Sequence, residues 1–249
     1  MAVHYENLGN TVVITISRPQ RRNAIDQETA MQLAAAWQRF ATDEAGHVGI
    51  LTGAGGNFSA GADLKAMDLH PGEGGFLGFT RLRCPKPTIA AIDGYCVAGG
   101  LEMALWCDLR VAGDGAVFGC FERRWGVPLV DGGTQRLPHI VGLGRALDMI
   151  LTGRAVDAAE AHDIGLVNRV VASGEELQAA LEIADTIAAA PSQTVRSDRA
   201  ALYDGLDASL RGGLSAEDRR GRQVMSVAFA GAARFAAGEG RHGSRVSDL

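Results

Sequence analysis

Four short runs of apolar, largely β-branched residues limit most strongly what this chain can fold into. The runs are Thr11–Ser17, Val48–Thr52, Thr88–Ile92 and Leu109–Ala112, and a glycine or proline follows each one closely. Such runs, bounded by turn residues, are typical of buried strands. The segments between them are long enough for helices. Strands that alternate with helices along the chain predict an α/β fold.

Three helices are expected between and after these strands. Asp26 caps the first, because a short acidic side chain can accept a hydrogen bond from the unpaired N–H groups of a helix start. The second helix is predicted to begin near Ala62 and the third near Gly99. The apolar face of the first helix is spaced three to four residues apart and consists of Ala30, Leu33, Ala34, Trp37 and Phe40.

The second half of the chain is predominantly helical. After about residue 135 we expect one further strand, Leu166–Val171, an amphipathic helix over Leu177–Ala190, and two or three helices over 195–237. We therefore divide the chain into a core, residues 1–194, and a C-terminal helical region, residues 195–249. A helical appendage in a chain of this size often packs against a second subunit, so we predict a homo-oligomer.

Composition excludes several classes of function. The net charge is -5 and there is no basic tract, which argues against a nucleic-acid partner. No apolar run is long enough to cross a bilayer, and the N-terminus lacks a secretory signal, so we expect a cytoplasmic protein without a membrane partner. The four cysteines are dispersed and no histidines form a His-x-x-x-His pair, so neither disulfides nor a metal site is predicted.

The most informative candidate for chemistry is Glu102, which lies three residues after Gly99. The N–H groups at a helix start are unpaired, and the helix dipole adds partial positive charge there. Such a start can stabilise a developing oxyanion, and a carboxylate beside it suits proton transfer next to a carbonyl carbon. Taken alone, a glutamate at this position also fits a structural capping role. Glu122, in Phe118–Glu122, is a second candidate, although most glutamates lie on solvated faces.

Three motifs in order resemble the crotonase (enoyl-CoA hydratase/isomerase) superfamily. They are the segments Arg18–Ile25, Phe58–Lys65 and Ile92–Glu102, and the resemblance extends from Arg18 to about Ala237. It implies a spiral of ββα turns, usually assembled as a homotrimer or a hexamer. It also implies a substrate carried as a coenzyme A thioester, with no other cofactor.

The resemblance implies roles for individual residues. The backbone N–H groups of Ala62 and Gly99 would form an oxyanion hole for the thioester oxygen. Coenzyme A would contact the first two motifs, with Lys65 near its phosphates, although an ordinary exposed lysine is nearly as consistent with the sequence. The residues expected to contact the acyl-CoA substrate are Arg22, Ala24, Ala60, Asp63, Leu64 and Lys65.

The acid–base residues decide which reaction such a site catalyses. Glu102 and Glu122 fall at the two positions of the hydratase pair, which implies hydration of a 2-enoyl-CoA. Two departures leave other reactions open. An ion pair of Arg123 or Arg124 with Glu122 would lower the pKa of Glu122. Asp131 precedes Gly132-Gly133, and it is either the acid–base group of a double-bond isomerase or a turn residue.

Further alternatives use the same expected oxyanion hole or no chemistry at all. Hydrolysis or decarboxylation of a CoA thioester on the same oxyanion hole is a third possible enzyme activity. A non-catalytic CoA-thioester binder or an RNA-binding member of the superfamily would need neither glutamate. The presence of both Glu102 and Glu122 argues against a binder without activity, and the acidic balance argues against RNA.

Overall fold

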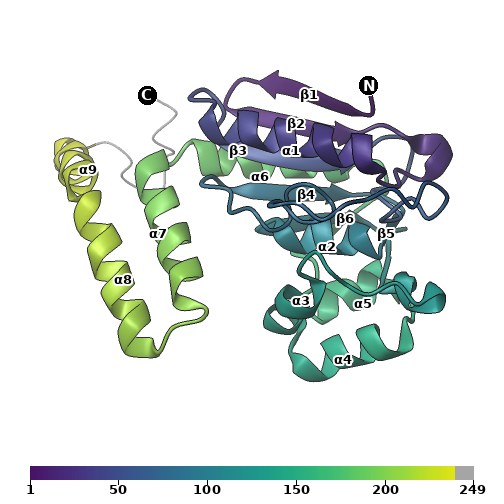
Figure 1. The fold of residues 1–249 in the computed structure, drawn as a ribbon. Helices are drawn as coiled ribbons and strands as arrows, with labels where there is room; N and C mark the ends of the chain where they lie inside the picture. Colours follow the sequence, from purple (N-terminus) through teal and green to yellow (C-terminus); the bar gives the residue numbers. More distant parts are fainter. Residues whose placement is uncertain (239–249) are drawn as a thin grey trace. The chain divides into compact units, whose positions relative to one another are not determined.

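The computed structural model describes residues 1–238, and the chain divides into two compact units with the boundary after Ala184. The sequence pattern predicts the division after residue 194 instead. The first unit carries both β-sheets and the second consists of helices (Figure 1). The two units are described one at a time.

A six-stranded sheet forms the frame of the first unit. Its first strand is antiparallel to the second, and every other neighbouring pair is parallel. The middle strands are buried on both faces, which explains why they read as continuous apolar runs rather than as alternating ones. In spatial order the strands are β1 (Val3–Leu8), β2 (Thr11–Ile16), β3 (Val48–Gly53), β4 (Thr88–Ile92), β6 (Leu109–Gly113) and β9 (Arg169–Val171).

A second, smaller sheet turns the chain into a spiral. It contains β5 (Tyr95–Val97), β7 (Val117–Gly119) and β8 (Val156–Asp157). Two isolated bridges extend the same layer, Ser59 to Cys96 and Ile25 to Ala62. Successive turns of the chain therefore supply one strand to the large sheet and then a short extended segment to the small one: β2 and Ile25, β3 and residues 59–62, β4 and β5, β6 and β7.

Helix α1 (Gln27–Thr42) packs its apolar face on the large sheet. The Asp26 carboxylate accepts a hydrogen bond from the N–H of Thr29 at 2.9 Å, which confirms the predicted cap. Trp37 and Phe40 are buried, and a Cβ on Gly49 of β3 would lie 2.8 Å from each of their rings, so the helix approaches the sheet closely there. The four strands predicted in the first half of the chain and the start of this helix are thus confirmed, and the ends of those strands differ by a residue at most.

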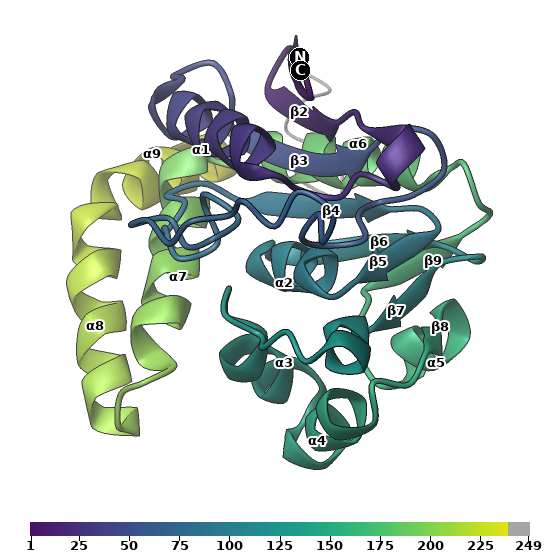
Figure 2. The ribbon, with the colours of Figure 1, turned by 45° about the vertical axis from the view of Figure 1, so that its right-hand side comes forward.

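Shorter helices follow the small sheet. Helix α2 (Gly99–Trp106) is buried along almost its whole length, which fits a sequence that is apolar apart from Glu102, and it contacts α3 (Gly133–Val141). Helices α3, α4 and α5 lie below α2 in both ribbon views (Figures 1 and 2). The remaining elements of this part are η1 (Pro19–Arg21), α2 (Gly99–Trp106), η2 (Phe121–Trp125), α3 (Gly133–Val141), α4 (Leu143–Thr152) and α5 (Ala158–Asp163).

Helix α6 (Glu176–Ala188) crosses the boundary, and the second unit continues with α7 (Ser192–Gly205), α8 (Leu210–Gln223) and α9 (Met225–Ala237). Three helices over 195–237 agree with the predicted two or three. Helices α7 and α8 lie side by side and share an ion pair of 2.6 Å between Arg220 Nε and Asp204 Oδ2 (Figure 2). Residues 239–249 of the predicted helical region lie outside the described residues.

Two sequence-based expectations are corrected. No helix begins near Ala62, because residues 60–63 are extended against Ile25 and the chain then turns at residues 64–66. The strand expected over Leu166–Val171 is only β9, since the N–H groups of Leu166 and Val167 both donate to Ala161 O at the end of α5. Among residues 1–238, no helix is long and apolar enough to cross a bilayer.

Candidate active site

A cavity of about 510 Å³ in the first unit gathers most of the residues singled out from the sequence. Glu102, Glu122 and Asp131 line it together with mainly apolar side chains. These three carboxylates belong to α2, η2 and the turn before α3. Of the other expected site residues, the lining includes Ala62, Gly99, Arg22, Ala60, Asp63 and Leu64, but neither Ala24 nor Lys65.

A pairing with Ile25 leaves the N–H of Ala62, a residue that lines the cavity, without a partner in the described chain. Ile25 N donates to Gly61 O at 2.8 Å, and Asp63 N donates to Ile25 O at 2.7 Å. Because successive N–H groups of an extended chain point to opposite edges, the N–H of Ala62 points away from Ile25. It has no acceptor among the described residues. The predicted donor is therefore free, although the predicted helix start is not what frees it.

The Gly99 N–H is the second unpaired donor at the cavity. Gly99 is the first residue of α2, where an N–H has no partner within the helix, and no described residue accepts from it. Ala98 before it adopts φ 52° and ψ -129°, a conformation that costs a non-glycine residue on the order of 1–3 kcal/mol. A Cβ on Gly61 would lie 2.7 Å from Gly99 N, so the two donor segments are in direct contact.

Glu102 is a buried carboxylate with one fixed oxygen. Oε1 accepts hydrogen bonds from Asp131 N at 2.9 Å and from Gly133 N at 2.8 Å. Burial raises the pKa of Glu102 to about 7, and the nearby charges of Asp131 and Glu122 act in the same direction against the lowering effect of the two N–H donors. Glu102 is therefore ready to exchange a proton near neutral pH.

Glu122 is buried without any hydrogen-bond partner among the described residues. Both carboxylate oxygens are inaccessible and unpaired. Burial raises the pKa of Glu122, and the proximity of its own backbone N–H and then the charge of Arg123 lower it less. The anticipated ion pair is absent in the described chain, because the Arg123 guanidinium donates to Ile150 O and that of Arg124 stacks on the Phe121 ring and donates to Gly153 O. The arginines therefore do not convert Glu122 into a low-pKa carboxylate.

Asp131 is buried and is more than a local turn residue. Its Oδ1 accepts from Thr80 Oγ1 at 2.5 Å and from Leu77 N at 3.2 Å. Both donors belong to a loop far from Asp131 in sequence. The sequence gives no signal for Thr80 or Leu77, because neither residue type nor spacing marks partners that lie 51 and 54 residues away in the chain.

Asp63 shapes the loop that carries Ala62. Its Oδ1 accepts from the N–H groups of Lys65 and Ala66, and its Oδ2 lies 3.2 Å from Arg18 Nη2. Arg18 also pairs with Asp26 Oδ2 at 2.6 Å, so this guanidinium joins the loop to the start of α1. Arg18 belongs to the first sequence motif, but the sequence did not predict that it would pair with both Asp63 and Asp26.

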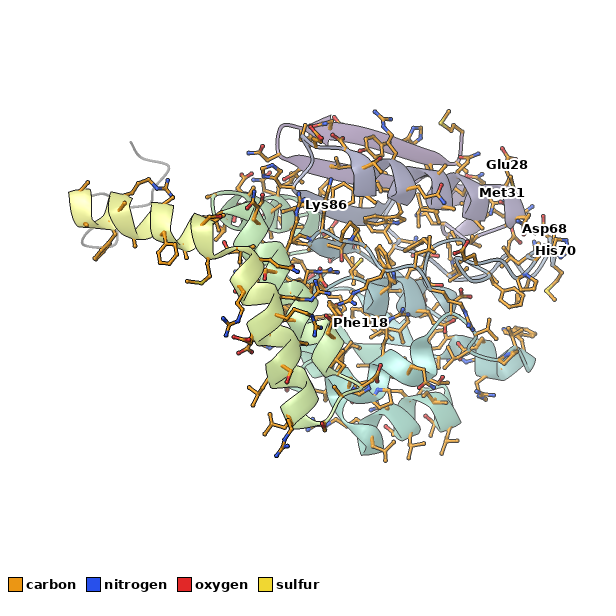
Figure 3. All side chains as sticks on the ribbon, turned by 60° about the vertical axis from the view of Figure 1, so that its left-hand side comes forward. Glu28, Met31, Asp68, His70, Lys86 and Phe118 are labelled. Atoms are coloured by element: carbon orange, nitrogen blue, oxygen red, sulfur yellow. The ribbon has the colours of Figure 1, made fainter. Side chains whose placement is uncertain are left out.

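The chain after Ala62 then returns to α1. Gln27 N donates to Asp68 Oδ1 at 3.1 Å, and His70 N donates to Gln27 Oε1 at 2.8 Å. Figure 3 shows Asp68 and His70 together with Glu28 and Met31 at this edge of the molecule. This anchoring leaves Met67, which lines the cavity, 71% exposed at its margin.

The margin of the cavity also carries aromatic side chains. Arg22 places its guanidinium carbon 5.0 Å from the centroid of the Tyr95 ring, and both residues line the cavity. Trp125 is 73% exposed and lines the cavity from η2. A cation at an exposed margin and a wall of apolar residues suit a ligand with an anionic part and an apolar part.

Comparison with known proteins identifies the family. The sequence pattern described as "Enoyl-CoA hydratase/isomerase" matches residues 6–237, nearly the whole chain. The chain belongs to the enoyl-CoA hydratase/isomerase family. The resemblance to crotonases and the expectation of an enzyme of this family are thereby confirmed.

Individual relatives agree. The enoyl-CoA hydratase EchA19 of Mycobacterium tuberculosis is 40% identical over 74% of this chain and 73% of its own. The mevalonyl-coenzyme A hydratase sidH of Aspergillus fumigatus is 38% identical over 78% of this chain and 75% of its own. The crystal structure of the enoyl-CoA hydratase EchA1 from Mycobacterium marinum superposes with a TM-score of 0.91 at 36% identity, and it covers 95% of this chain and 96% of that one. The predicted crotonase-like α/β fold is confirmed.

Proposed function

We propose that this enoyl-CoA hydratase/isomerase family member adds water to a 2-enoyl-CoA and forms the 3-hydroxyacyl-CoA. One observation carries the proposal: two buried glutamates and two unpaired backbone N–H groups line the same cavity. The names of relatives such as the M. tuberculosis hydratase support it. Donors and carboxylates together supply what addition to a thioester-activated double bond requires.

In this proposal the N–H groups of Ala62 and Gly99 bind the thioester oxygen. Addition of water at C3 pushes the double-bond electrons onto that oxygen and creates an enolate. Donors placed beforehand at such an oxygen each stabilise the transition state by about 3–4 kcal/mol. The contact between Gly61 and Gly99 N supports a single site for both donors.

The glutamates move the protons. One of Glu102 and Glu122, ionised, takes a proton from the water as its oxygen bonds to C3. The other, protonated, gives its proton to C2 as the enolate collapses. The pair thus needs one proton in total, and the raised pKa of each carboxyl favours retaining that proton near neutral pH.

The cavity margin would hold the coenzyme A part of the substrate. We assign Arg22, Ala60 and Leu64 to direct contact, because all three line the cavity. Lys65 is exposed on the same loop and remains a candidate for the phosphates, whereas the Asp63 carboxylate is occupied by Arg18 and organises the loop. Ala24 is buried outside the lining, and its carbonyl oxygen accepts from Arg18, so it acts through the fold.

Double-bond isomerisation is the second candidate, because Asp131 lines the same cavity. The two hydrogen bonds to its Oδ1 give that oxygen a structural role and favour hydration over isomerisation. Cytoplasmic location and the absence of a nucleic-acid partner stay predictions.

A substrate panel with product identification tests the proposal. Purified protein with crotonyl-CoA should lose the absorbance of the conjugated double bond and yield 3-hydroxybutyryl-CoA. Conversion of 3-enoyl-CoA to 2-enoyl-CoA without hydration would instead establish the isomerase. Release of free coenzyme A or loss of carbon dioxide would point to hydrolysis or decarboxylation, and no turnover with any acyl-CoA would overturn the proposal.

A further inference from the structure

The orientation of Glu102 depends on a backbone segment that the sheet does not hold. Both hydrogen bonds to Glu102 Oε1 come from N–H groups at the start of α3: Asp131 lies just before the helix and Gly133 is its first residue. A Cβ on Gly133 would lie 3.0 Å from Glu102 Oε1, so the backbone is already at closest approach. Any displacement of this segment therefore displaces the donors at the carboxylate.

A buried contact with the loop 74–80 fixes that segment. Thr80 Oγ1 donates to Asp131 Oδ1 at 2.5 Å, and both residues are buried, with 0% and 2% exposure. Gly75 permits the approach, because a Cβ there would lie 2.4 Å from Asp131 Oδ1 and its φ is +86°. The Arg136 guanidinium also links the two backbone segments, because it donates to Asp131 O at 2.9 Å and to Thr80 O at 2.5 Å.

The same loop reaches the oxyanion side of the cavity. Leu77 donates its N–H to Asp131 Oδ1, and its side chain lies 3.0 Å from where a Cβ on Gly99 would be. The loop 74–80 thus touches both the Gly99 donor segment and the segment that holds Glu102. The Thr80–Asp131 hydrogen bond joins this loop to the segment that holds Glu102.

We propose that Thr80 and Asp131 are positioning residues, whose side-chain hydrogen bond keeps the Asp131 and Gly133 N–H groups on Glu102 Oε1. The effect on turnover rests on the hydration reaction proposed above, whereas the effect on Glu102 itself does not. Neither residue needs to touch the reacting atoms.

The test compares Thr80→Val, which keeps the shape and removes the donor, with Thr80→Ser, which keeps the hydroxyl. Thr80→Val should lower kcat for crotonyl-CoA hydration about 10–100-fold, because small displacements of a reacting group cost factors of this size. KM should change little, and Thr80→Ser should retain most of the rate. In a Glu102→Gln background, Thr80→Val should change the residual rate little, because its effect acts through Glu102. A general structural defect would lower both backgrounds alike.

A second readout needs no substrate. N–H donors stabilise a carboxylate, so loosening them should raise the pKa of Glu102 in Thr80→Val above that in Thr80→Ser. Carbon NMR of carboxyl-labelled protein measures this, and the Glu102 signal is assigned by its loss in Glu102→Gln. The charges of Asp131 and Glu122 face Glu102 equally in both variants. Thr80→Ala replaces Thr80→Val if the latter does not fold.

The outcomes separate the two proposals. Suppose the wild type hydrates crotonyl-CoA, and Thr80→Val has the same rate and the same Glu102 pKa as the wild type. This result would overturn the positioning role and leave the proposed function standing. If the wild type hydrates nothing, the proposed function fails. The NMR titration then decides alone: a higher Glu102 pKa in Thr80→Val supports the positioning role, and equal values in the two variants overturn it.

Discussion

Glu102 and Glu122 occupy the same cavity in different surroundings. Two N–H donors hold one oxygen of Glu102, whereas both oxygens of Glu122 are buried without a partner among the described residues. An unpaired buried carboxylate is costly, so its presence needs a functional reason such as an incoming water or substrate atom. This contrast supports different parts for two identical side chains in the proton relay that we propose.

Removing either carboxyl should stop the relay. Glu102→Gln and Glu122→Gln should each lower kcat for hydration by about 10²–10⁴, because general acid–base groups contribute factors of this size. Asp131→Asn should cost less than either, since an amide oxygen can still accept from Thr80. Rates on 2-enoyl- and 3-enoyl-CoA provide the comparison. Near wild-type hydration by Glu122→Gln would overturn the two-glutamate mechanism, and a dominant loss with Asp131→Asn would favour the isomerase.

Glu102 should also lower the free energy of unfolding at neutral pH relative to its value at acidic pH. Its pKa is raised from 4.5 to about 7 in the folded protein, so the folded state holds this proton more tightly than the unfolded state. The resulting penalty is absent below pH 4.5, grows between 4.5 and 7, and is complete above 7, where it is on the order of 3 kcal/mol. Urea unfolding should therefore show Glu102→Gln gaining stability relative to wild type as pH rises from 4.5 to 8. A pH-independent difference between the two proteins would contradict this.

At the scale of elements, apolar periodicity predicted the strands and helices that local sequence determines. It missed the segments whose conformation depends on residues distant in the chain. The strands β2, β3, β4 and β6 and the helix capped by Asp26 follow from apolar spacing and capping. The extended segment at Ala62 does not, because Ile25 and the Arg18–Asp63 contact hold it from outside. Likewise motifs predicted residues that line one cavity, among them Glu102 and Glu122, but the Thr80–Asp131 bond links residues that no local pattern connects.

The helix start at Gly99 allows a direct test of the oxyanion donor. Gly99→Pro removes the N–H at the first position of α2, where a helix tolerates proline. Hydration should be abolished in protein whose circular dichroism matches the wild type. A folded Gly99→Pro protein with normal activity would overturn the assignment. Ala62→Pro applies the same test to the second donor, because its N–H likewise has no acceptor in the described chain.

At the scale of the whole molecule, the helices of the second unit expose several large apolar side chains. Leu202 on α7 and Leu206, the residue that caps α7, are spaced four residues apart, as are Leu210 and Leu214 on α8, so each pair lies on one face. Phe229 and Phe235 on α9 are 68% and 62% exposed. Exposed apolar patches of this kind mark interaction surfaces, and the partner we propose is a second copy of the chain.

Light scattering should therefore find a homotrimer or a hexamer at micromolar concentration. The double variant Leu214→Asp/Phe229→Asp places two charges on this surface and should shift the protein towards smaller species, because an unpaired charge in an apolar interface loses its hydration. Met31→Asp serves as the matched control, since Met31 is 63% exposed on α1, outside the C-terminal helices. If the wild type is a stable monomer, the assembly is wrong. If Met31→Asp dissociates the protein and the double variant does not, the oligomer is real but the C-terminal helices do not form its interface.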